Sequence, residues 1–341
     1  MNALRFGVCA PIFAVPGNLA FRTPNMAALD AETVRAFSTR ADALRYDSLW
    51  VADHLMLGKD EAIFEGWTTL SVLAGATRSI RLGLIHQSNV LRHPSLAAKM
   101  AATLDQLSSG RLIHFFDLGN NGREHRAYGF DWIEEDAQRV EMMEEALEQI
   151  IALWTATEPV SRRGTYYSLH EAVCRPGPLQ HPHPPIWVGE CKAGMLDLCA
   201  RRAQGWNSVP VGRHELAQRL TKLGEACRRN GRALDELECS YETQILIAAD
   251  RAELRSKVKH MLALGGGVPD PQWVDFVEDR SSAVPAGLTE RFLIGTPDEV
   301  EEQIRSYAEL GIDHFMLWFM DAPDEEGLAL FAKEVMPAFR S

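Results

Sequence analysis

The first predicted β-strand and the turn after it read Leu4-Arg5-Phe6-Gly7-Val8-Cys9-Ala10-Pro11-Ile12-Phe13. The run from Leu4 to Ala10 is mostly apolar, which is typical of a strand that is buried in a parallel sheet. A doubly wound, Rossmann-type sheet would carry a GxGxxG turn directly after this strand. The chain has Ala10-Pro11-Ile12-Phe13 at that point, so the open nucleotide-binding sheet is the weaker of two α/β interpretations.

The same kind of apolar run returns along the whole chain, each time followed by a helical pattern. The runs predict strands at 4–10, 48–52, 80–86, 111–117, 185–189, 205–210, 239–248 and 314–319. Amphipathic patterns predict helices at 31–45, 67–77, 95–107, 137–154, 193–203, 214–229, 251–264, 297–310 and 325–338. Strands that alternate with helices indicate parallel pairing, because a parallel neighbour needs a long crossover. Eight such units favour a closed (β/α)8 TIM barrel, formed as one domain over residues 1–341.

Two connections are longer than the others. Residues 118–184 follow the fourth strand and contain a helical pattern and then a proline-rich stretch, and residues 265–290 follow the seventh strand. Connections of this length are usually functional lids or mobile segments. Because the loops after the strands build the active site of a barrel, we expect insertions after strands 4 and 7. A surface linker remains an equal alternative for residues 265–290.

The charge of the chain argues against several classes of partner. Its 47 acidic and 35 basic residues give a net charge of -12, which repels phosphate backbones and anionic membranes. No uncharged apolar run approaches the ~20 residues of a membrane helix, and the N-terminus lacks a signal-peptide pattern. We therefore expect a small-molecule substrate, and neither a nucleic acid nor a membrane as partner.

The six cysteines carry no metal signature. None forms a CxxC pair or a zinc-like cluster with histidines. Reduced thiols are typical of the cytoplasm. The sequence therefore predicts a cytoplasmic chain without a metal site.

Several motifs follow one another along the chain. The longest is Tyr46-Asp47-Ser48-Leu49-Trp50-Val51-Ala52-Asp53-His54, which contains the second predicted strand. The others are Arg92-His93-Pro94, Leu104-Asp105-Gln106-Leu107-Ser108-Ser109-Gly110-Arg111, Pro184-Pro185-Ile186-Trp187-Val188-Gly189, Gly205-Trp206-Asn207 and Gly295-Thr296-Pro297-Asp298-Glu299-Val300. Together they resemble the bacterial-luciferase-like class of flavin-dependent oxidoreductases and monooxygenases, over nearly the whole chain. The resemblance implies a barrel, a homodimer, and FMN or the deazaflavin F420 bound at the carboxyl ends of the strands.

The resemblance assigns a catalytic histidine. His54 matches a histidine at the end of the second strand that often faces the flavin, and imidazole suits proton transfer near neutral pH. The alternative is a histidine that only hydrogen-bonds a neighbouring loop. Asp53, which precedes it, either takes part in catalysis or orients the turn.

The end of the third strand is the next expected contact with the cofactor. Members of the class often have a non-proline cis peptide there, beneath the flavin ring, which places it within Ile85-His86-Gln87 of this sequence. His86 and Gln87 would then hydrogen-bond the edge of the ring. The alternative for His86 is a polar residue of the barrel interior. Ala10, which ends the first strand, is also expected to contact the cofactor.

The fourth strand leads into Asp117-Leu118-Gly119-Asn120. Relatives commonly have Trp or Glu where Asn120 stands, and an amide cannot act as the acid there. Asp117 would contribute charge to the pocket, or it would pair with Arg111, Arg123 or a backbone amide.

The loop after the fifth strand, Gly189-Glu190-Cys191-Lys192-Ala193-Gly194, opens a predicted helix. Backbone amides at the start of a helix favour a phosphate. The resemblance implies that this loop holds the phosphate of the flavin. Glu190 departs from the pattern of the class, since its carboxylate would repel a phosphate, and Lys192 would compensate.

These assignments predict an FMN-dependent monooxygenase that receives reduced flavin from a separate reductase, uses oxygen and acts on a small organic substrate. An F420-dependent hydride-transfer enzyme is the nearest alternative, and a non-catalytic flavin-binding protein is a third. The acidic tail of F420 needs cations at the barrel mouth. Lys192 beside Glu190 weakly favours FMN, whereas Arg92, Arg123, Arg126 and Arg175, in nearby loops, would favour F420.

Overall fold

The computed structural model describes residues 3–19, 24–189, 191–265 and 270–340. Within them eight parallel strands form a ring, in the order β1-β2-β3-β5-β8-β9-β10-β12. Pairing of β12 with β1 closes the ring. The strands are β1 (Arg5–Cys9), β2 (Ser48–Ala52), β3 (Arg81–Ile85), β5 (Leu112–Asp117), β8 (Ile186–Val188), β9 (Gly205–Ser208), β10 (Glu238–Ile247) and β12 (His314–Phe319). The predicted (β/α)8 barrel is confirmed, and the strand ends differ from the predicted ones by at most two residues.

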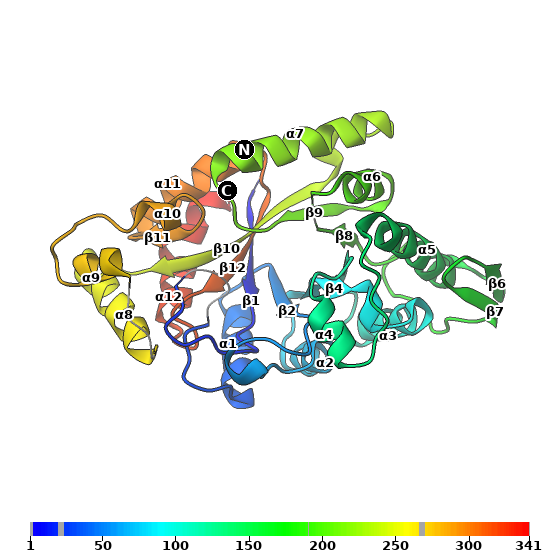
Figure 1. Ribbon diagram of the computed structural model, residues 1–341, viewed down its shortest axis with the longest axis horizontal. Helices are drawn as coiled ribbons and strands as arrows, with labels where there is room; N and C mark the ends of the chain where they lie inside the picture. The colour runs from blue at the N-terminus through cyan, green and yellow to red at the C-terminus, as the bar shows by residue number, and fades with distance from the viewer. Residues whose placement is uncertain (1–2, 20–23, 190, 266–269, 341) are drawn as a thin grey trace.

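Helices surround the ring of strands (Figure 1). They are α1 (Ala31–Ala43), α2 (Gly66–Ala76), α3 (Pro94–Leu107), α5 (Asp136–Thr155), α6 (Ala193–Arg202), α7 (Arg213–Arg229), α8 (Arg251–Leu264) and α11 (Pro297–Ala308). The start of α11 shows how the sequence sets these limits. The amide of Thr296 donates to Glu299 over 2.8 Å, and Pro297 occupies the first helical turn, where its missing N–H costs nothing.

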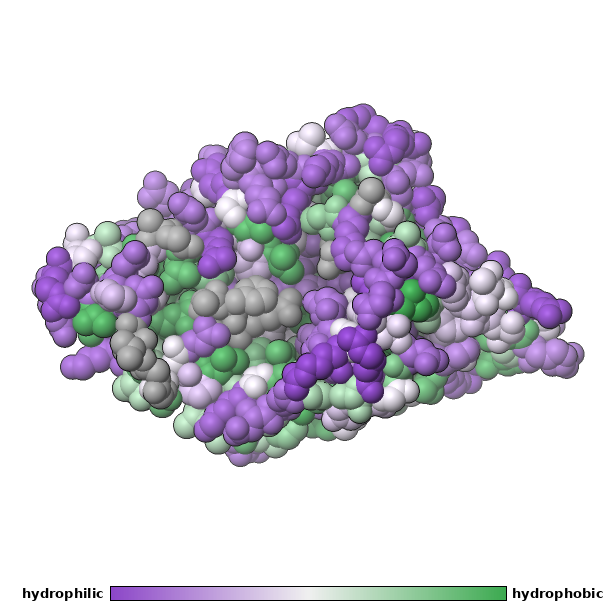
Figure 2. Space-filling view, in the orientation of Figure 1, coloured by the Kyte–Doolittle hydropathy of each residue, from purple (hydrophilic) through white to green (hydrophobic). Residues whose placement is uncertain are grey.

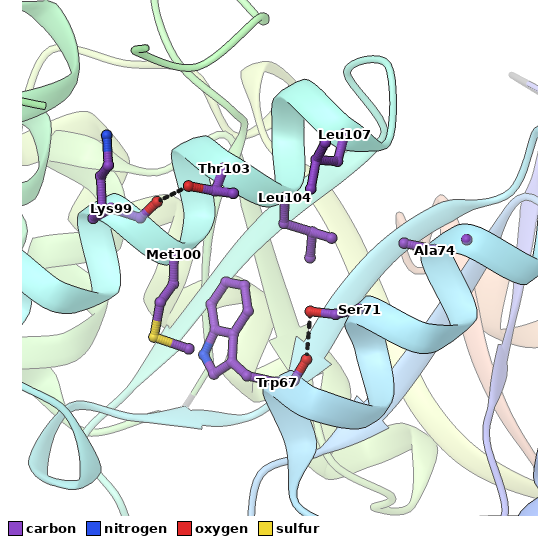
Figure 3. A pocket seen from close by; sticks show the side chains of 9 residues that line it. Trp67, Ser71, Ala74, Lys99, Met100, Thr103, Leu104 and Leu107 are labelled. Atoms are coloured by element: carbon purple, nitrogen blue, oxygen red, sulfur yellow. Dashed lines mark hydrogen bonds between the residues drawn. The ribbon is translucent and has the colours of Figure 1, made fainter. Parts of the chain in front are cut away.

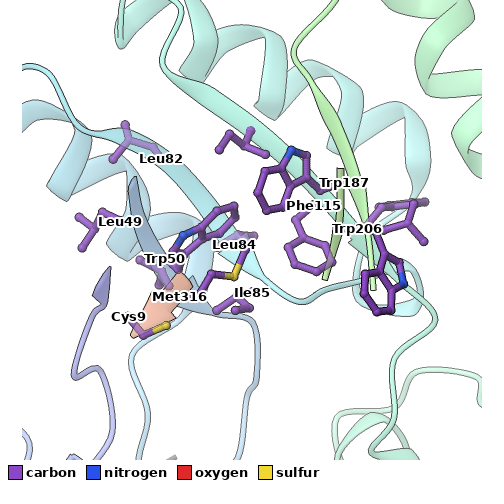
Figure 4. Packing of buried hydrophobic residues seen from close by; sticks show 14 of the residues in the cluster. Cys9, Leu49, Trp50, Leu82, Leu84, Ile85, Phe115, Trp187, Trp206 and Met316 are labelled. Atoms are coloured by element: carbon purple, nitrogen blue, oxygen red, sulfur yellow. The ribbon is translucent and has the colours of Figure 1, made fainter. Parts of the chain in front are cut away.

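Large aromatic residues fill the interior of the barrel. The rings of Trp50 and Trp187 lie 5.3 Å apart, and Trp50 packs edge-on against Phe115 (Figure 4). Glycines make room for them, since a Cβ atom on Gly83 would lie 2.3 Å from Trp50 and one on Gly205 would lie 2.4 Å from Trp187. The interior is therefore a packed core and not a channel.

The strand β10 extends beyond the barrel. Its first residues pair with β9 and its middle with β12, while Ile245–Ile247 pair with a short additional strand, β11 (Leu293–Gly295). A second hydrophobic core forms around this outer part, with Leu254 and Met261 of α8, Trp273 and Phe292 among its members. In Figure 1 this part of the molecule, with α8 and α9 (Pro271–Val277), lies at the left.

Several short elements escaped the sequence prediction. They are β4 (Gln87–Ser88), α4 (Gly122–Ala127), the hairpin of β6 (Val160–Arg163) and β7 (Ser168–Ala172), α9, α10 (Ala286–Thr289) and β11. The predicted last helix is divided into α12 (Glu326–Leu330), a π-helical turn at Phe331–Val335 and a 3-10 turn at Met336–Phe339. The connection 118–184 thus contains α4, α5 and the hairpin, and its function as a lid stays a prediction.

The start of each strand lies at the end of the barrel opposite to the carboxyl ends. At this amino-terminal end Glu238 lies within 2.5 Å of Arg5 and 3.5 Å of Arg81, and it accepts a hydrogen bond from His314. The amide of Leu4 also donates to Phe339 at 3.1 Å. These contacts tie β1, β3, β10 and β12 together.

The face of the molecule seen in the orientation of Figure 1 is mostly polar. Figure 2 shows a face on which hydrophilic residues prevail and hydrophobic ones gather near its centre and left. Among the described residues no helix combines the length and the apolar composition that a membrane span requires.

Candidate active site

The predicted catalytic histidine pairs with a buried carboxylate. Nδ1 of His54, just beyond β2, lies 2.9 Å from Oε2 of Glu124 in α4. Glu124 also accepts hydrogen bonds from the amide of Leu55 and, at 2.9 Å, from the side chain of Asn121. Because a carboxylate only accepts, His54 carries a proton on Nδ1, and its Nε2 remains for proton exchange.

Glu124 is held in its ionised form. Burial alone would raise the pKa of this carboxyl, but the bonds and charge of His54, the Leu55 amide and the charge of His125 outweigh burial and lower its pKa. An ionised carboxylate behind an imidazole fixes the ring and stabilises its protonated form. The pair can therefore take up and release a proton at one defined nitrogen.

Asp53 has partners of a different kind. Its two oxygens receive the guanidinium of Arg92 at 2.8 and 2.9 Å, and Oδ2 accepts from the amide of Ser88 at 3.1 Å. Arg92 also donates to Glu65, which caps the start of α2. Burial alone would lower the pKa of Arg92, but Asp53 and Glu65 raise it. These contacts favour the orienting alternative for Asp53.

The end of the third strand has the backbone geometry that the resemblance implies, because the Ile85–His86 peptide is cis. Gln87 is buried in β4, which pairs with the end of β5. The hydroxyl of Ser88 lies 2.9 Å from Nε2 of His125. The loops after β2, β3 and β5 are therefore linked by side-chain hydrogen bonds.

A cavity of about 120 Å³ lies beside these loops, at the carboxyl ends of β3, β5, β8 and β9. The residues that line it are His86, Asp117, Asn120, Cys191, Asn207, Val209 and Arg219. Sites for whole small-molecule ligands usually exceed 300 Å³, so this cavity has room for one part of a cofactor. It brings together four of the predicted cofactor-binding residues: His86, Asp117, Asn120 and Cys191.

The described residues of the loop after β8, the fifth strand of the barrel, have two kinds of neighbour. One of them lines the cavity, and others contact helix α5. Cys191 lines the cavity, but Nζ of Lys192 lies 2.7 Å from Asp136 of α5. A Cβ atom on Gly194 would lie 3.0 Å from Val140, so this glycine packs against α5. Lys192 is thus engaged by a carboxylate of α5.

The remaining predicted residues of the site lie at strand ends. Gly189 follows β8, and a Cβ atom on it would lie 3.3 Å from Phe115 and 3.4 Å from Asp117. Ala10 is buried beyond β1, and its amide donates to Trp50. Ala193 is the first residue of α6. Glu190 lies outside the described residues.

Arg219 of α7 brings a cation to the cavity, although it is paired with Glu215. It lines the cavity and donates to the hydroxyl of Ser208 at 3.1 Å, while Glu215 holds its other nitrogens. The helix α6 begins directly beside Cys191, and a helix start favours anions. A cation and a helix start beside a small polar cavity suit the phosphate of a flavin or deazaflavin, whereas the carboxylate of Asp117 in the same lining opposes it.

Other candidate cations are paired elsewhere. Arg123 pairs with Glu61, Arg126 with Glu134, and Arg175 with the carbonyl of Thr157. Arg111 is bound at the opposite end of the barrel, where it donates to the carbonyl of Ala74 at 2.7 Å. The suggested pairing of Asp117 with Arg111 or Arg123 is therefore wrong.

A larger groove lies away from the strand ends. It measures about 370 Å³ and runs between α2 and α3, where Trp67 and Ser71 face Met100 and Leu104 (Figure 3). A second groove, of about 320 Å³, lies on the other side of α2, against α1. Both are on the outer surface of the barrel, so neither is a candidate for the catalytic pocket.

Sequence reasoning missed three residues of the site: Glu124, Asn207 and Arg219. Glu124 directly precedes His125 in the connection after the fourth strand, and its acidic type was the only available signal. Among the described residues no group of three or more His, Cys, Asp or Glu side chains is arranged to hold a metal ion.

Comparison with known proteins places this geometry in a family. Residues 4–314 match the family of luciferase-like monooxygenases. A phthiodiolone/phenolphthiodiolone dimycocerosates ketoreductase of Mycobacterium tuberculosis is 29% identical, over 93% of this chain and 92% of that protein. An F420-dependent glucose-6-phosphate dehydrogenase of Microbacterium testaceum is 26% identical, over 89% of this chain and 92% of that protein.

Solved structures agree on the fold. An F420-dependent secondary alcohol dehydrogenase, in complex with an F420-acetone adduct, superimposes with a TM-score of 0.76 at 20% identity, over the full length of both chains. Because the family match covers most of the barrel, the chain belongs to the luciferase-like monooxygenase family and is an oxidoreductase.

Proposed function

We propose that this oxidoreductase transfers a hydride between F420 and a carbonyl or alcohol carbon of a small organic substrate. Two relatives that match nearly the whole chain support this choice, since one is named a ketoreductase and the other an F420-dependent dehydrogenase. Both names describe the exchange of a hydride at a carbon that bears oxygen.

The observation that carries the proposal is the contact between His54 and Glu124. Reduction of a carbonyl adds a hydride to carbon and a proton to oxygen, and oxidation of an alcohol reverses both transfers. F420, when bound, supplies or accepts the hydride. His54 supplies or accepts the proton through Nε2, and the Glu124 carboxylate stabilises the imidazolium that forms.

A second candidate is an FMN-dependent monooxygenase, which the sequence favoured. One structural observation supports it. Arg92, Arg123, Arg126 and Lys192 are each paired with carboxylates, so these cations are engaged and do not offer free charge to the acidic tail of F420. FMN carries one phosphate only, and Arg219, whose Nη1 lies outside its ion pair with Glu215, lines the cavity.

Equilibrium titration of the protein with F420 and with FMN separates the two candidates. We expect F420 to bind with submicromolar Kd, FMN to bind more weakly, and the loaded protein to oxidise or reduce a simple secondary alcohol–ketone pair. Arg219→Met serves as a test of the phosphate site, because it should weaken both cofactors. Tight binding of FMN with weak binding of F420 would overturn hydride transfer and favour the monooxygenase.

A further inference from the structure

A second carboxylate, that of Glu242, lies inside the barrel beneath the cavity. Glu242 belongs to β10 and is fully buried. Its Oε1 accepts a hydrogen bond from Nε1 of Trp318 at 2.8 Å, and its Oε2 lies 3.2 Å from Nε2 of His86. Burial of a carboxylate is costly unless donors surround it, so each of these contacts counts.

Asn207 completes the group and brings a further donor to it. Its Oδ1 lies 2.7 Å from the hydroxyl of Ser240, which turns its amide nitrogen toward His86 and Glu242, at 3.2 and 3.5 Å. An amide nitrogen only donates, and so does a protonated ring nitrogen. Donation from Asn207 to Nε2 of His86 would leave the proton of that ring on Nδ1, whereas donation to Glu242 Oε2 leaves Nε2 able to donate to the same carboxylate. The second arrangement gives the buried carboxylate two further donors, which its burial requires.

The ring of His86 is also held from the side. It packs edge-on against Phe115, with centroids 4.8 Å apart and planes at 81°. His86 lines the cavity together with the titratable residues Asp117, Cys191 and Arg219. Among the described residues its Nδ1 has no hydrogen-bond partner, whereas Nε2 has two neighbours.

We propose that Glu242 is a positioning residue that keeps the proton of His86 on Nε2, so that Nδ1 is a hydrogen-bond acceptor at the cavity. This inference rests on the proposed function only in the identity of the ligand. The pyrimidine edge of a flavin or deazaflavin carries an imide N–H, a donor that matches such an acceptor. The opposite tautomer would present a donor and lose this match.

The tautomer is measured directly on the cofactor-free protein. Nitrogen-15 labelling of the 11 histidines, with His86→Gln to assign its signal, reports which ring nitrogen carries the proton. We expect a neutral His86 protonated on Nε2. A proton on Nδ1, or on both nitrogens, would overturn the proposal even if Glu242 variants do not fold.

A matched pair of variants tests the role of Glu242. Glu242→Gln should alter the tautomer signal of His86 and weaken binding of F420 and FMN by about tenfold, the effect of one lost charged hydrogen bond. Glu238→Gln is the control, because it changes a partly buried glutamate of the same strand that contacts His314. It should leave the His86 signal unchanged. An unaltered signal in Glu242→Gln contradicts the proposal, whereas failure to bind F420 affects only the proposed function.

Discussion

Oε1 of Glu238 lies 2.7 Å from Nδ1 of His314, at the end of the barrel away from the active site. Nε2 of the same ring lies 2.7 Å from the hydroxyl of Ser48, which in turn accepts from Trp50. Burial alone would raise the pKa of Glu238, but His314, Arg81 and Arg5 outweigh burial and lower it to about 2. This group makes the barrel sensitive to acid.

We expect the contribution of Glu238 to stability to be complete above its ordinary pKa and to be lost as the pH falls toward 2. A lowered pKa in the folded state means that the unfolded chain binds the proton more readily. The difference in unfolding free energy between the wild type and Glu238→Gln should therefore shrink by about 2 kcal/mol from about pH 5 to about pH 3. Denaturant titrations at both pH values measure it, and a constant difference would contradict the assignment.

Replacement of His54 by Asn should slow turnover by about 100-fold, the typical contribution of a positioned acid or base, while binding of the cofactor stays nearly unchanged. His170→Asn is the matched control, since His170 lies exposed on the hairpin strand β7. Steady-state rates and cofactor titration give both quantities. Turnover within a few-fold of the wild type would mean that His54 only supports the loop.

Replacement of Asp53 by Asn should destabilise the protein by about 3 kcal/mol, because Arg92 then loses its main partner in a buried position. The double variant Asp53→Asn/Arg92→Met should lose less free energy of unfolding than the two single variants lose together. Glu32→Gln, which breaks an exposed pair with Arg35, is the control and should cost less than about 1 kcal/mol. A stable but inactive Asp53→Asn protein would instead support a catalytic role for Asp53.

Two glycines with the same backbone conformation distinguish two costs of a change to alanine, namely backbone strain and a steric clash of the new Cβ atom. Gly119 has φ +76° and Gly129 has φ +77°, but a Cβ atom would meet Ser88 Oγ at 2.5 Å only at Gly119. Gly129→Ala should lower the free energy of unfolding by about 1 kcal/mol, because alanine is strained in the left-handed conformation. Gly119→Ala should lower it by about 2 kcal/mol more, because the Cβ atom also clashes with Ser88, and it should disturb the contact of Ser88 with His125. Equal decreases in Tm for the two variants would show that the Cβ atom at position 119 does not clash with Ser88.

We propose that a second copy of the chain docks on the face of α2. This helix is a ridge between two grooves, and a twofold axis would seat the ridge of one copy in a groove of the other. Val72 of α2 and Leu107 at the end of the adjacent α3 are exposed to 57% and 80%, and the groove between the two helices has Lys99 as the one charged residue among those described in its lining. Sedimentation at micromolar concentration should give a dimer.

Charge at the same face should separate the copies. Val72→Glu/Leu107→Glu should sediment as a monomer with unchanged folding, because two buried carboxylates per copy oppose association. Val173→Glu is the control, since Val173 is exposed to 51% at the far hairpin. A monomeric wild type, or a dimeric double variant, contradicts this interface.

The sequence predicts the barrel because its strands and helices follow local patterns. The run at residues 48–52 is apolar and bounded by polar residues, and the Thr296-Pro297 cap is visible in the sequence. The elements that were missed are short or exposed. The strand β11 has only three residues, and β6 is mostly exposed, so neither carries a periodic signal.

The site was only partly predictable, because its decisive contacts join distant residues. His54 and Glu124 are 70 positions apart, and Asn207 and His86 are 121 apart. Closure of the barrel brings them together, and no local pattern encodes that. The family resemblance supplied His54 and the cis peptide at His86. It supplied neither Glu124 nor Glu242, and it left Arg219 unnamed.

The outer half of β10 has a consequence for how such a barrel can diversify. Because the segment after this strand packs mainly on a core of its own, around Trp273 and Phe292, it can be lengthened, replaced or grafted with little effect on the interior of the ring. Evolution and protein engineering therefore have one region in which insertions and replacements disturb the fold least, while the packed interior around Trp50 and Trp187 keeps its shape.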